Sequence, residues 1–241
     1  MEPRRVMLAS VLSQFGDAFE FVFTSKESRS GGSDVGGAQL LGLLWDHLSL
    51  SAVSLAIGIA VALPLGVWLG HTRRGTFLAV GVANVGRAVP SIALIALFFA
   101  FLGTGFTNIA LALALLAIPP ILANVYVGIR QVEPETVDAA RGMGMSALQI
   151  VRRVELPLAL PLVVGGIRTS AVNVVATATI APLAGVSSLG DPIIAYGVYG
   201  DAGRLGASMV VAALAVATEV SFGLAQRLAD PLPSRRRSVP A

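Results

Sequence analysis

The stretch "DAARGMGMSALQIVRRVELP", Asp138–Pro157, is a charged insertion in a chain that is otherwise mostly apolar. Ser146 is followed by Gln149 at the spacing of a capping box, which predicts the start of a helix. We expect this helix to end near Leu156–Pro157, because a proline disfavours helical geometry in the residue before it. The stretch is therefore typical of a compact surface segment and not of a membrane span.

A second short helix is expected just before it. Pro134 suits a first helical turn, and Glu133 and Glu135 beside it favour the positive end of the helix dipole. Gly142 and Gly144 then interrupt the helix, so a glycine turn should separate the two helices. The first helix would carry a small apolar face that can seat in a groove of a soluble partner. That face comprises Val137, Ala140 and Met143.

Composition places the rest of the chain in a membrane. Of its 241 residues, 55% are hydrophobic and 13% are charged, and the mean hydropathy is +0.78. A soluble domain carries about a quarter charged residues, so we expect an all-α integral membrane protein. The basic residues stand at the ends of apolar runs and form no stripe, which argues against nucleic acid as a partner.

Cysteine and histidine usage argues against a metalloenzyme. The chain has no cysteine and two histidines, His47 and His71, which are far apart in the sequence. No thiolate site and no histidine pair with ligand spacing can be built from them. We therefore predict no metal site.

Five segments are apolar and long enough to span a membrane, which takes roughly 20 residues. The second contains Pro90, which removes a backbone donor and predicts a kink or break. Residues 48–228 are taken as the transmembrane domain, and residues 229–241 as a basic tail. The five segments are about Leu48–Gly70, Thr76–Leu102, Thr107–Ile129, Leu158–Ala181 and Leu205–Leu228.

The N-terminal residues 1–23 are expected to form an amphipathic helix that lies in the membrane interface. Apolar residues such as Phe15, Phe19 and Val22 recur there at helical spacing, with polar residues on the other side. Residues 24–47 are expected to form a polar extracytoplasmic loop before the first span. If the N-terminal helix spanned the membrane instead, the chain would have six spans.

The arginines orient the chain. Basic residues gather in cytoplasmic segments of membrane proteins, and five spans that begin outside put most arginines on the inner side. The C-terminus and residues 131–157 are then cytoplasmic. The arginines on the inner side are Arg73, Arg74, Arg130, Arg141, Arg152, Arg153, Arg227, Arg235, Arg236 and Arg237. The two halves of the chain show no internal repeat, so we expect a dimer whose interface forms any pathway.

The charged insertion resembles the main cytoplasmic loop of ABC importer permeases. That loop carries Glu-Ala-Ala, then Gly, then Ile, and then Leu-Pro at fixed spacings. Here Glu is replaced by Asp and Ile by Val, and every spacing is the same. The matching residues are Asp138, Ala139, Ala140, Gly144, Val154, Leu156 and Pro157. The alternative is a helical hairpin that merely connects two spans.

The resemblance implies a type I permease bundle whose coupling helices dock on a cytoplasmic ABC ATPase dimer. Alongside the matched residues, Arg141 would pair with Asp138 or with the ATPase. This chain has no G-x-x-x-x-G-K-[ST] phosphate loop, so ATP and Mg²⁺ are expected on the separate ATPase. The chain itself would be a transport subunit and not an enzyme. Its other implied partners are an extracytoplasmic substrate-binding protein, a second permease copy or a paralogue, and membrane lipid.

Three further stretches resemble the branch of this family that imports glycine betaine, choline and carnitine. They are "ANVGRAVPSIAL" (Ala83–Leu94), "LPLALPLVVGGIRTS" (Leu156–Ser170) and "SLGDPII" (Ser188–Ile194). The branch often has glutamine at the position of Arg87 and threonine at that of Ala88, so the solute stays open. The implied location is the inner membrane of a bacterial or archaeal cell, as a multi-pass protein.

Polar residues inside the spans are candidates for the translocation path. Thr169, Asn173 and Thr177 are four apart and share one helical face, although such residues also form hydrogen bonds between helices. Arg87 either lies near the path or pairs with carbonyl groups. Arg168 is expected to snorkel or to form an ion pair. The full candidate set is Asn84, Arg87, Pro90, Ser91, Thr169, Asn173 and Thr177.

The loop "APLAGVSSLGDPIIAYGVYGDAGR", Ala181–Arg204, is implied by the resemblance to face the binding protein as an outer gate. Tyr196 and Tyr199 suit a cation-π cage for a quaternary ammonium, but aromatic residues are also ordinary at a membrane interface. The candidate gate residues are Gly190, Asp191, Tyr196 and Tyr199.

The function that these features favour is import of a quaternary-amine osmoprotectant by alternating access. Two alternatives stay open. One is an ABC permease for another small solute such as an amino acid. The other is a membrane anchor that binds a soluble partner and transports nothing.

Overall fold

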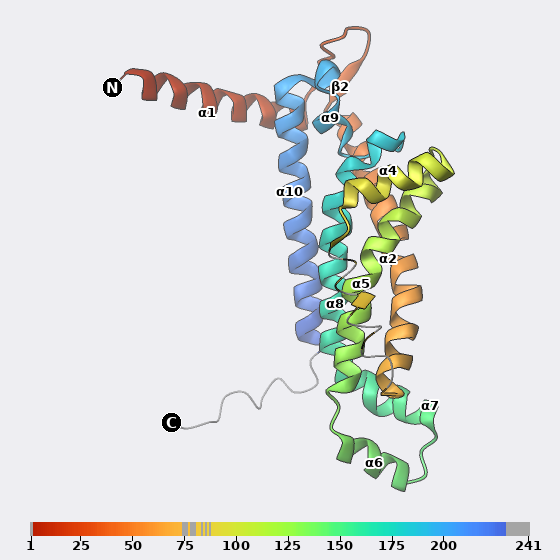
Figure 1. Ribbon diagram of the computed structural model, residues 1–241. Helices are drawn as coiled ribbons and strands as arrows, with labels where there is room; N and C mark the ends of the chain where they lie inside the picture. Colours follow the sequence, from red (N-terminus) through yellow and green to blue (C-terminus); the bar gives the residue numbers. More distant parts are fainter. Residues whose placement is uncertain are drawn as a thin grey trace, which may run out of the picture. The chain divides into compact units, whose positions relative to one another are not determined.

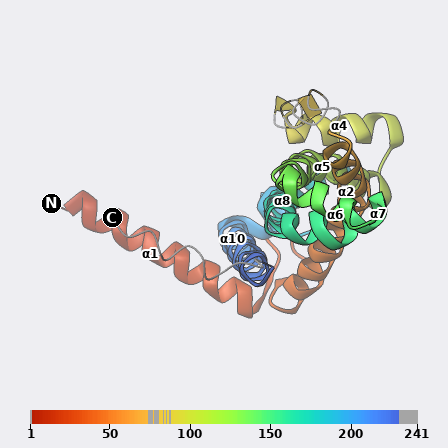
Figure 2. The ribbon, with the colours of Figure 1, turned by 90° about the horizontal axis from the view of Figure 1, so that it is seen from below.

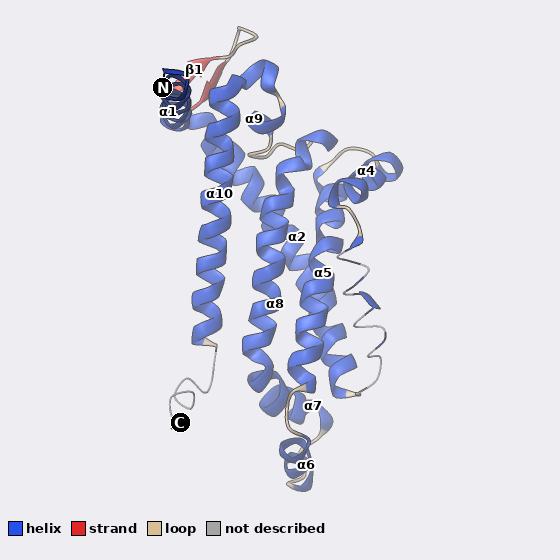
Figure 3. Ribbon diagram, turned by 60° about the vertical axis from the view of Figure 1, so that its left-hand side comes forward, coloured by secondary structure: helices blue, strands red, loops and turns tan. Residues whose placement is uncertain are grey.

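The computed structural model describes residues 2–73, 77, 81–82, 84, 86 and 88–229, with side chains from residue 13 onward. In this part of the chain the strands are β1 (Ser25–Glu27) and β2 (Asp34–Gly36), which pair antiparallel (Figure 3). The other elements are the helices α1 (Glu2–Phe23), α2 (Ala38–His71), α4 (Ser91–Leu102), α5 (Phe106–Arg130), α6 (Pro134–Gly142), α7 (Ala147–Ile150), the π-helix η1 (Val151–Glu155), α8 (Leu156–Thr177), the 3-10 helix η2 (Ala178–Ala184), α9 (Asp191–Ile194) and α10 (Tyr196–Leu228) (Figure 1).

Four helical stretches of the described chain are long and apolar enough to span a membrane, and α4 is a shorter apolar helix. The helical membrane architecture is as predicted, whereas the five expected spans correspond to four long apolar helices and one shorter one in the described residues. Part of the expected span Thr76–Leu102 lies outside the described residues. The predicted break at Pro90 is present, because Ala88 is helical, Val89 and Pro90 are not, and α4 begins at Ser91. The four stretches are Ala38–His71, Phe106–Arg130, Ala147–Ala184 and Tyr196–Leu228.

The helix that contains the first expected span begins at Ala38, ten residues before Leu48, so the second part of the expected loop 24–47 is helical. Asp46 and His47 fall in the expected loop but lie within α2. His47 is fully buried, and its Nε2 lies 2.9 Å from the carbonyl oxygen of Val175. A hydrogen bond of this kind lets a polar ring occupy a helix interior.

The N-terminal segment is helical, as predicted, and α1 is not among the four candidate spans. Its side chains divide by face: Ala18 and Phe21 are buried, whereas Phe15, Phe19 and Phe23 are exposed. Phe21 lies against α10, where a Cβ on Gly203 would be 3.2 Å from its ring. Figures 1 and 2 show α1 crossing the beginning of α10 and extending away from it.

The described helices contribute to two compact units. The first consists of Met1–Ser54, Ser91–Leu113 and Val174–Ala217, and the second of Leu55–Pro90, Ala114–Asn173 and Thr218–Ala241. The first unit has a core that joins the hairpin, the start of α2 and the loop before α9. Its buried members are Phe21, Val35, Leu40, Leu43 and Leu189.

Small residues set the packing of the second unit. Gly58, Ala62, Gly66 and Gly70 recur every four residues in a stripe on α2, and the three glycines face Ala117, Val125 and Ile129 of α5. A Cβ on Gly66 would lie 2.8 Å from the Cβ of Val125, which is closer than real side chains approach. Such stripes let membrane helices pack with their backbones close together. α2 therefore presses against α5 along this stripe.

Candidate functional site

The segment 131–157 folds as predicted in its first two-thirds. α6 begins at Pro134, and α7 begins after Ser146, whose hydroxyl accepts a hydrogen bond from the Gln149 amide at 3.4 Å. The Gln149 side chain accepts in return from the Ser146 amide at 2.8 Å, which completes the capping box. Gly144 between the helices has a φ of +83°. Glycine adopts this left-handed conformation without the steric cost that a side chain brings.

The segment has a small core of its own. Four residues are buried together, and Met145 and Val154 pack against them. The predicted docking face is therefore wrong in part, because two of its three residues point into this core. The four buried residues are Val132, Val137, Ala140 and Ile150.

The apolar side chains that stay exposed are different ones. Met143 is 73% exposed in the glycine turn, and Leu148 is 63% exposed on α7. Asp138 and Arg141 are also exposed and pair at 2.8 Å, as one of the two predicted options had it. An exposed pair of this kind contributes ~0 to 1 kcal/mol. The surface available to a partner thus centres on the glycine turn and α7.

The helix after the glycine turn does not end at Leu156–Pro157, contrary to the prediction. α7 continues through η1 directly into α8, and the amide of Leu156 donates to the carbonyl of Val151. This wider π-type spacing is the local adjustment that lets a helix carry a proline without breaking. The part of the segment from Ala147 onward is therefore continuous with a candidate span.

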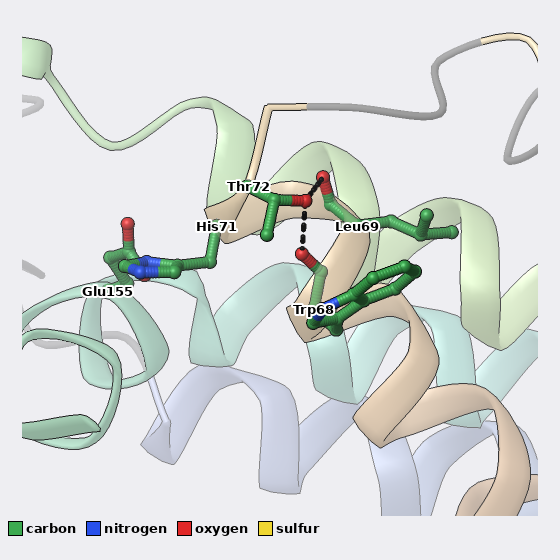
Figure 4. Close-up of polar contacts among 5 residues, drawn as sticks. All are labelled: Trp68, Leu69, His71, Thr72 and Glu155. Carbon is green, nitrogen blue, oxygen red and sulfur yellow. Dashed lines mark hydrogen bonds and ion pairs between the residues drawn. The ribbon is translucent and has the colours of Figure 1, made fainter. Parts of the chain in front are cut away.

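His71 and Glu155 connect this segment to α2. The Nδ1 atom of His71, the last residue of α2, lies 2.7 Å from a carboxylate oxygen of Glu155 in η1 (Figure 4). The Glu155 side chain is 6% exposed, so it is a buried carboxylate, and within the described part of the chain His71 lies close to it. Beside it, the Thr72 hydroxyl donates to the carbonyl of Trp68 at 2.8 Å and helps to close the end of α2. We call the His71–Glu155 contact the latch.

Reasoning from the sequence missed the latch. Its two residues are 84 positions apart, so no local pattern joins them. A partial signal was available, since Glu155 is an acidic residue immediately before an apolar span. Buried carboxylates need a partner, and His71 was one of only two histidines in the chain.

Arg168 forms an ion pair, as one of the two predicted readings had it. Its guanidinium donates to Glu219 of α10, and its Nη1 also donates to the Gln226 side-chain oxygen at 3.1 Å. Gln226 in turn donates to the carbonyl of Pro161 at 3.0 Å. These side chains line a groove of about 720 Å³ between α8 and α10. Neither Glu219 nor Gln226 was identified from the sequence.

The candidate path residues fall in different places. On α8, Thr169 and Asn173 are exposed and Thr177 is half-buried. The Thr169 hydroxyl donates to the carbonyl of Gly165, one turn earlier, at 3.1 Å. Asn84 and Pro90 are exposed and Ser91 is half-buried, whereas Arg87 lies outside the described residues. Their role in transport stays a prediction.

The candidate outer gate is tightly bonded within the first unit. The Asp191 carboxylate accepts from the Ser188 amide at 2.7 Å, and burial raises the pKa of this carboxyl above its usual value. Gly190 leaves no room for a side chain, because a Cβ there would lie 1.8 Å from the carbonyl oxygen of Thr179. The loop around α9 is therefore closely packed at Gly190 and hydrogen-bonded at Asp191.

The two gate tyrosines already have partners. The Tyr196 ring has the guanidinium carbons of Arg29 and Arg204 at 5.0 and 5.3 Å from its centre. The Tyr199 hydroxyl accepts from the Gln39 amide at 3.2 Å. In this conformation the Tyr196 ring makes cation-π contacts with two arginines of the chain itself.

Comparison with known proteins identifies the protein family of this chain. The family described as "Binding-protein-dependent transport system inner membrane component" matches residues 62–232. The chain belongs to this family and is a permease subunit of a binding-protein-dependent ABC importer. Such subunits are non-catalytic, and membership implies an ATPase and a binding protein as partners.

Curated relatives and a solved structure agree with this assignment. The chain is 35% identical over 201 residues to the choline transport system permease protein OpuBB of Bacillus subtilis, covering 83% of this chain and 93% of the relative. It is 37% identical over 188 residues to the carnitine transport permease protein OpuCB of Listeria monocytogenes, covering 78% and 86%. A chain of the inward-facing MetNI methionine ABC transporter matches with a TM-score of 0.69 and 25% identity, covering 79% of this chain and 95% of that one.

Proposed function

We propose that this chain is the permease of an ABC importer for quaternary-amine osmoprotectants of the glycine betaine, choline and carnitine type. The observation that carries the proposal is the similarity, over most of the chain, to permeases named for choline and for carnitine. Another relative, from Bacillus subtilis, is named for glycine betaine, carnitine and choline together and is 34% identical over 196 residues. The departure at Arg87 leaves the preferred member of this group open.

The coupling of transport to ATP hydrolysis is assigned to segment 131–157. The exposed Met143 and Leu148 offer an apolar contact, and the same segment also exposes the charged pair Asp138–Arg141. Such a surface suits a groove on a soluble partner, here the ATPase that binds ATP and Mg²⁺. The continuous helix from Ala147 to Ala184 would carry movement of this contact into the membrane.

The exposed polar face of α8 supports a pathway at an interface between two permeases. Asn173 is exposed in a span, where lipid cannot form hydrogen bonds with its amide, and Thr169, whose hydroxyl already bonds to Gly165, is exposed on the same face. A second permease copy or a paralogue would face them and enclose the solute. In this arrangement the C-terminus and segment 131–157 lie on the cytoplasmic side.

Among the alternatives, an importer for an amino acid keeps one supporting observation, the similarity in fold to the methionine transporter. The anchor that transports nothing is not supported, because the chain belongs to a family of transport permeases.

Competition for uptake tests the solute class. The complete complex of permease, ATPase and binding protein is reconstituted in liposomes, and uptake of radiolabelled glycine betaine is measured. Unlabelled choline or carnitine should compete, whereas methionine should not. Uptake of methionine without uptake of any quaternary amine would contradict the proposed solute class.

Cross-linking tests the ATPase contact. Because the chain has no cysteine, Met143→Cys and Leu148→Cys each introduce a unique thiol. Both should cross-link to a cysteine on the ATPase surface. Trp45→Cys, which is 72% exposed near the start of α2, is the control and should not cross-link. Absence of any cross-link at Met143 and Leu148 in the assembled complex would refute the assignment.

A further inference from the structure

The groove between α8 and α10 holds a charge pair that is only partly covered. The Arg168 and Glu219 side chains are 34% and 43% exposed. Arg168 lies twelve residues after the first residue of α8, which places it about 18 Å along that helix. Glu219 lies nine residues before the end of α10, or about 14 Å along it. Both charges are thus well inside helices that are long and apolar enough to span the membrane.

Charges at such a depth do not face lipid. Ionisable residues in spans face a water-filled cavity or other protein, because hydrocarbon cannot solvate them. The exposed parts of Arg168 and Glu219 therefore face water or a partner subunit. Both side chains line a groove of about 720 Å³, together with Gln226.

The neighbours of Arg168 hold it in place independently of Glu219. Nη1 of Arg168 bonds to Gln226, and Gln226 is fixed by the carbonyl of Pro161. Arg168 also packs against Gly223 of α10, where a Cβ would lie at the ordinary contact distance of 3.5 Å from Nη1. If Glu219 turned away, the guanidinium would stay oriented in the groove with one edge free.

We propose that Arg168 and Glu219 form a transient binding subsite for a zwitterion on its way through the permease. Arg168 would bind the carboxylate of the solute, and Glu219 would face its ammonium group. This inference rests on the proposed function, because glycine betaine and carnitine carry both charges and choline carries only the positive one. A zwitterion can replace the internal pair without leaving either charge unpaired in the membrane.

Two single substitutions separate this role from a purely structural ion pair. Arg168→Gln removes the group that would bind the carboxylate of the solute, and it leaves Glu219 in place. Maximal uptake of glycine betaine should therefore fall about tenfold or more relative to that of choline. Glu219→Gln leaves an uncompensated positive charge, so choline uptake should fall by a similar factor relative to glycine betaine. A structural bridge would change both solutes equally.

Matched variants control for assembly. Arg168→Lys and Glu219→Asp keep both charges and should keep the wild-type ratio of the two uptake rates. If the wild-type complex transports neither solute, the proposed function fails. If it transports both and the ratio is the same in every assembled variant, the subsite alone is refuted. If the single neutral variants fail to assemble but the double variant Arg168→Gln/Glu219→Gln assembles, the pair is a structural bridge and the proposal is overturned.

Thiol labelling tests the subsite without altering its charges. Leu224→Cys places a unique thiol in the groove, and Val216→Cys places one on the same helix outside it. A water-soluble thiol reagent should label Leu224→Cys, and saturating glycine betaine should slow this labelling more than an uncharged solute of similar size does. Failure of the reagent to label Leu224→Cys, or equal labelling with both solutes, would overturn the proposal.

Discussion

Replacement of Glu155 by glutamine tests whether the latch transmits movement from the ATPase contact to the spans. The side chains have the same size, so Glu155→Gln keeps the shape of the site and one acceptor oxygen. It removes the charge that strengthens the 2.7 Å contact with His71. Charge-assisted hydrogen bonds are about twice as strong as neutral ones, so the latch should lose about 1 to 2 kcal/mol. That loss makes the open latch about 5 to 30 times more populated.

The assay is the ratio of solute molecules imported to ATP molecules hydrolysed in liposomes that hold the complete complex. Because the latch joins the base of segment 131–157 to α2, loosening it should lower this ratio while ATP hydrolysis continues. Glu27→Gln makes the same chemical change at an exposed position of β1 and should leave the ratio unchanged.

A double-mutant cycle tests whether His71 and Glu155 act on coupling through their contact with each other. His71→Gln should lower the coupling ratio as Glu155→Gln does, and combining the two should add little, since both remove one interaction. An assembled Glu155→Gln complex with the wild-type ratio would refute the reasoning. Strictly additive effects of the two substitutions would refute the latch as a pair.

Three other substitutions have expected outcomes. Gly66→Leu places a side chain where even a Cβ would lie only 2.8 Å from Val125, so the yield of folded permease and its thermal midpoint in detergent should fall sharply. The control Gly42→Leu, at an open position, should lower neither the yield nor the thermal midpoint. Ser146→Ala removes the capping-box acceptor and should cost the segment about 1 kcal/mol, measured as faster hydrogen exchange in α7. Asp138→Asn breaks only an exposed ion pair, so the thermal midpoint should change little and any loss of transport would point to a contact with the ATPase.

Local patterns predicted the local structure well. The capping box at Ser146, the left-handed glycine at position 144 and the break at Pro90 each follow from the chemistry of a few neighbouring residues. Apolar run length likewise predicted the helical membrane architecture, because a bilayer admits few other solutions. The start of the first long helix was placed too late, because an apolar run of membrane length gives the minimum extent of a helix, and α2 continues for ten residues before it.

The tertiary contacts of the candidate sites could not be predicted in this way. The latch and the Arg168–Glu219 pair join residues 84 and 51 positions apart. A lone sequence shows that a buried charge needs a partner but not which residue supplies it. The continuation of the helix through Pro157 was missed for a different reason, because a π-type turn can absorb a proline that normally ends a helix.

The most direct test of the central claim is ATP-driven uptake of radiolabelled glycine betaine or choline by the reconstituted complex, with Gly144→Leu and Gly142→Leu compared side by side. Both glycines lie in open space in segment 131–157, but only Gly144 has a positive φ. We expect uptake that needs both ATP and the binding protein, strongly reduced in Gly144→Leu and largely retained in Gly142→Leu. Absence of ATP-driven uptake of any quaternary amine, or full uptake by Gly144→Leu, would contradict the account.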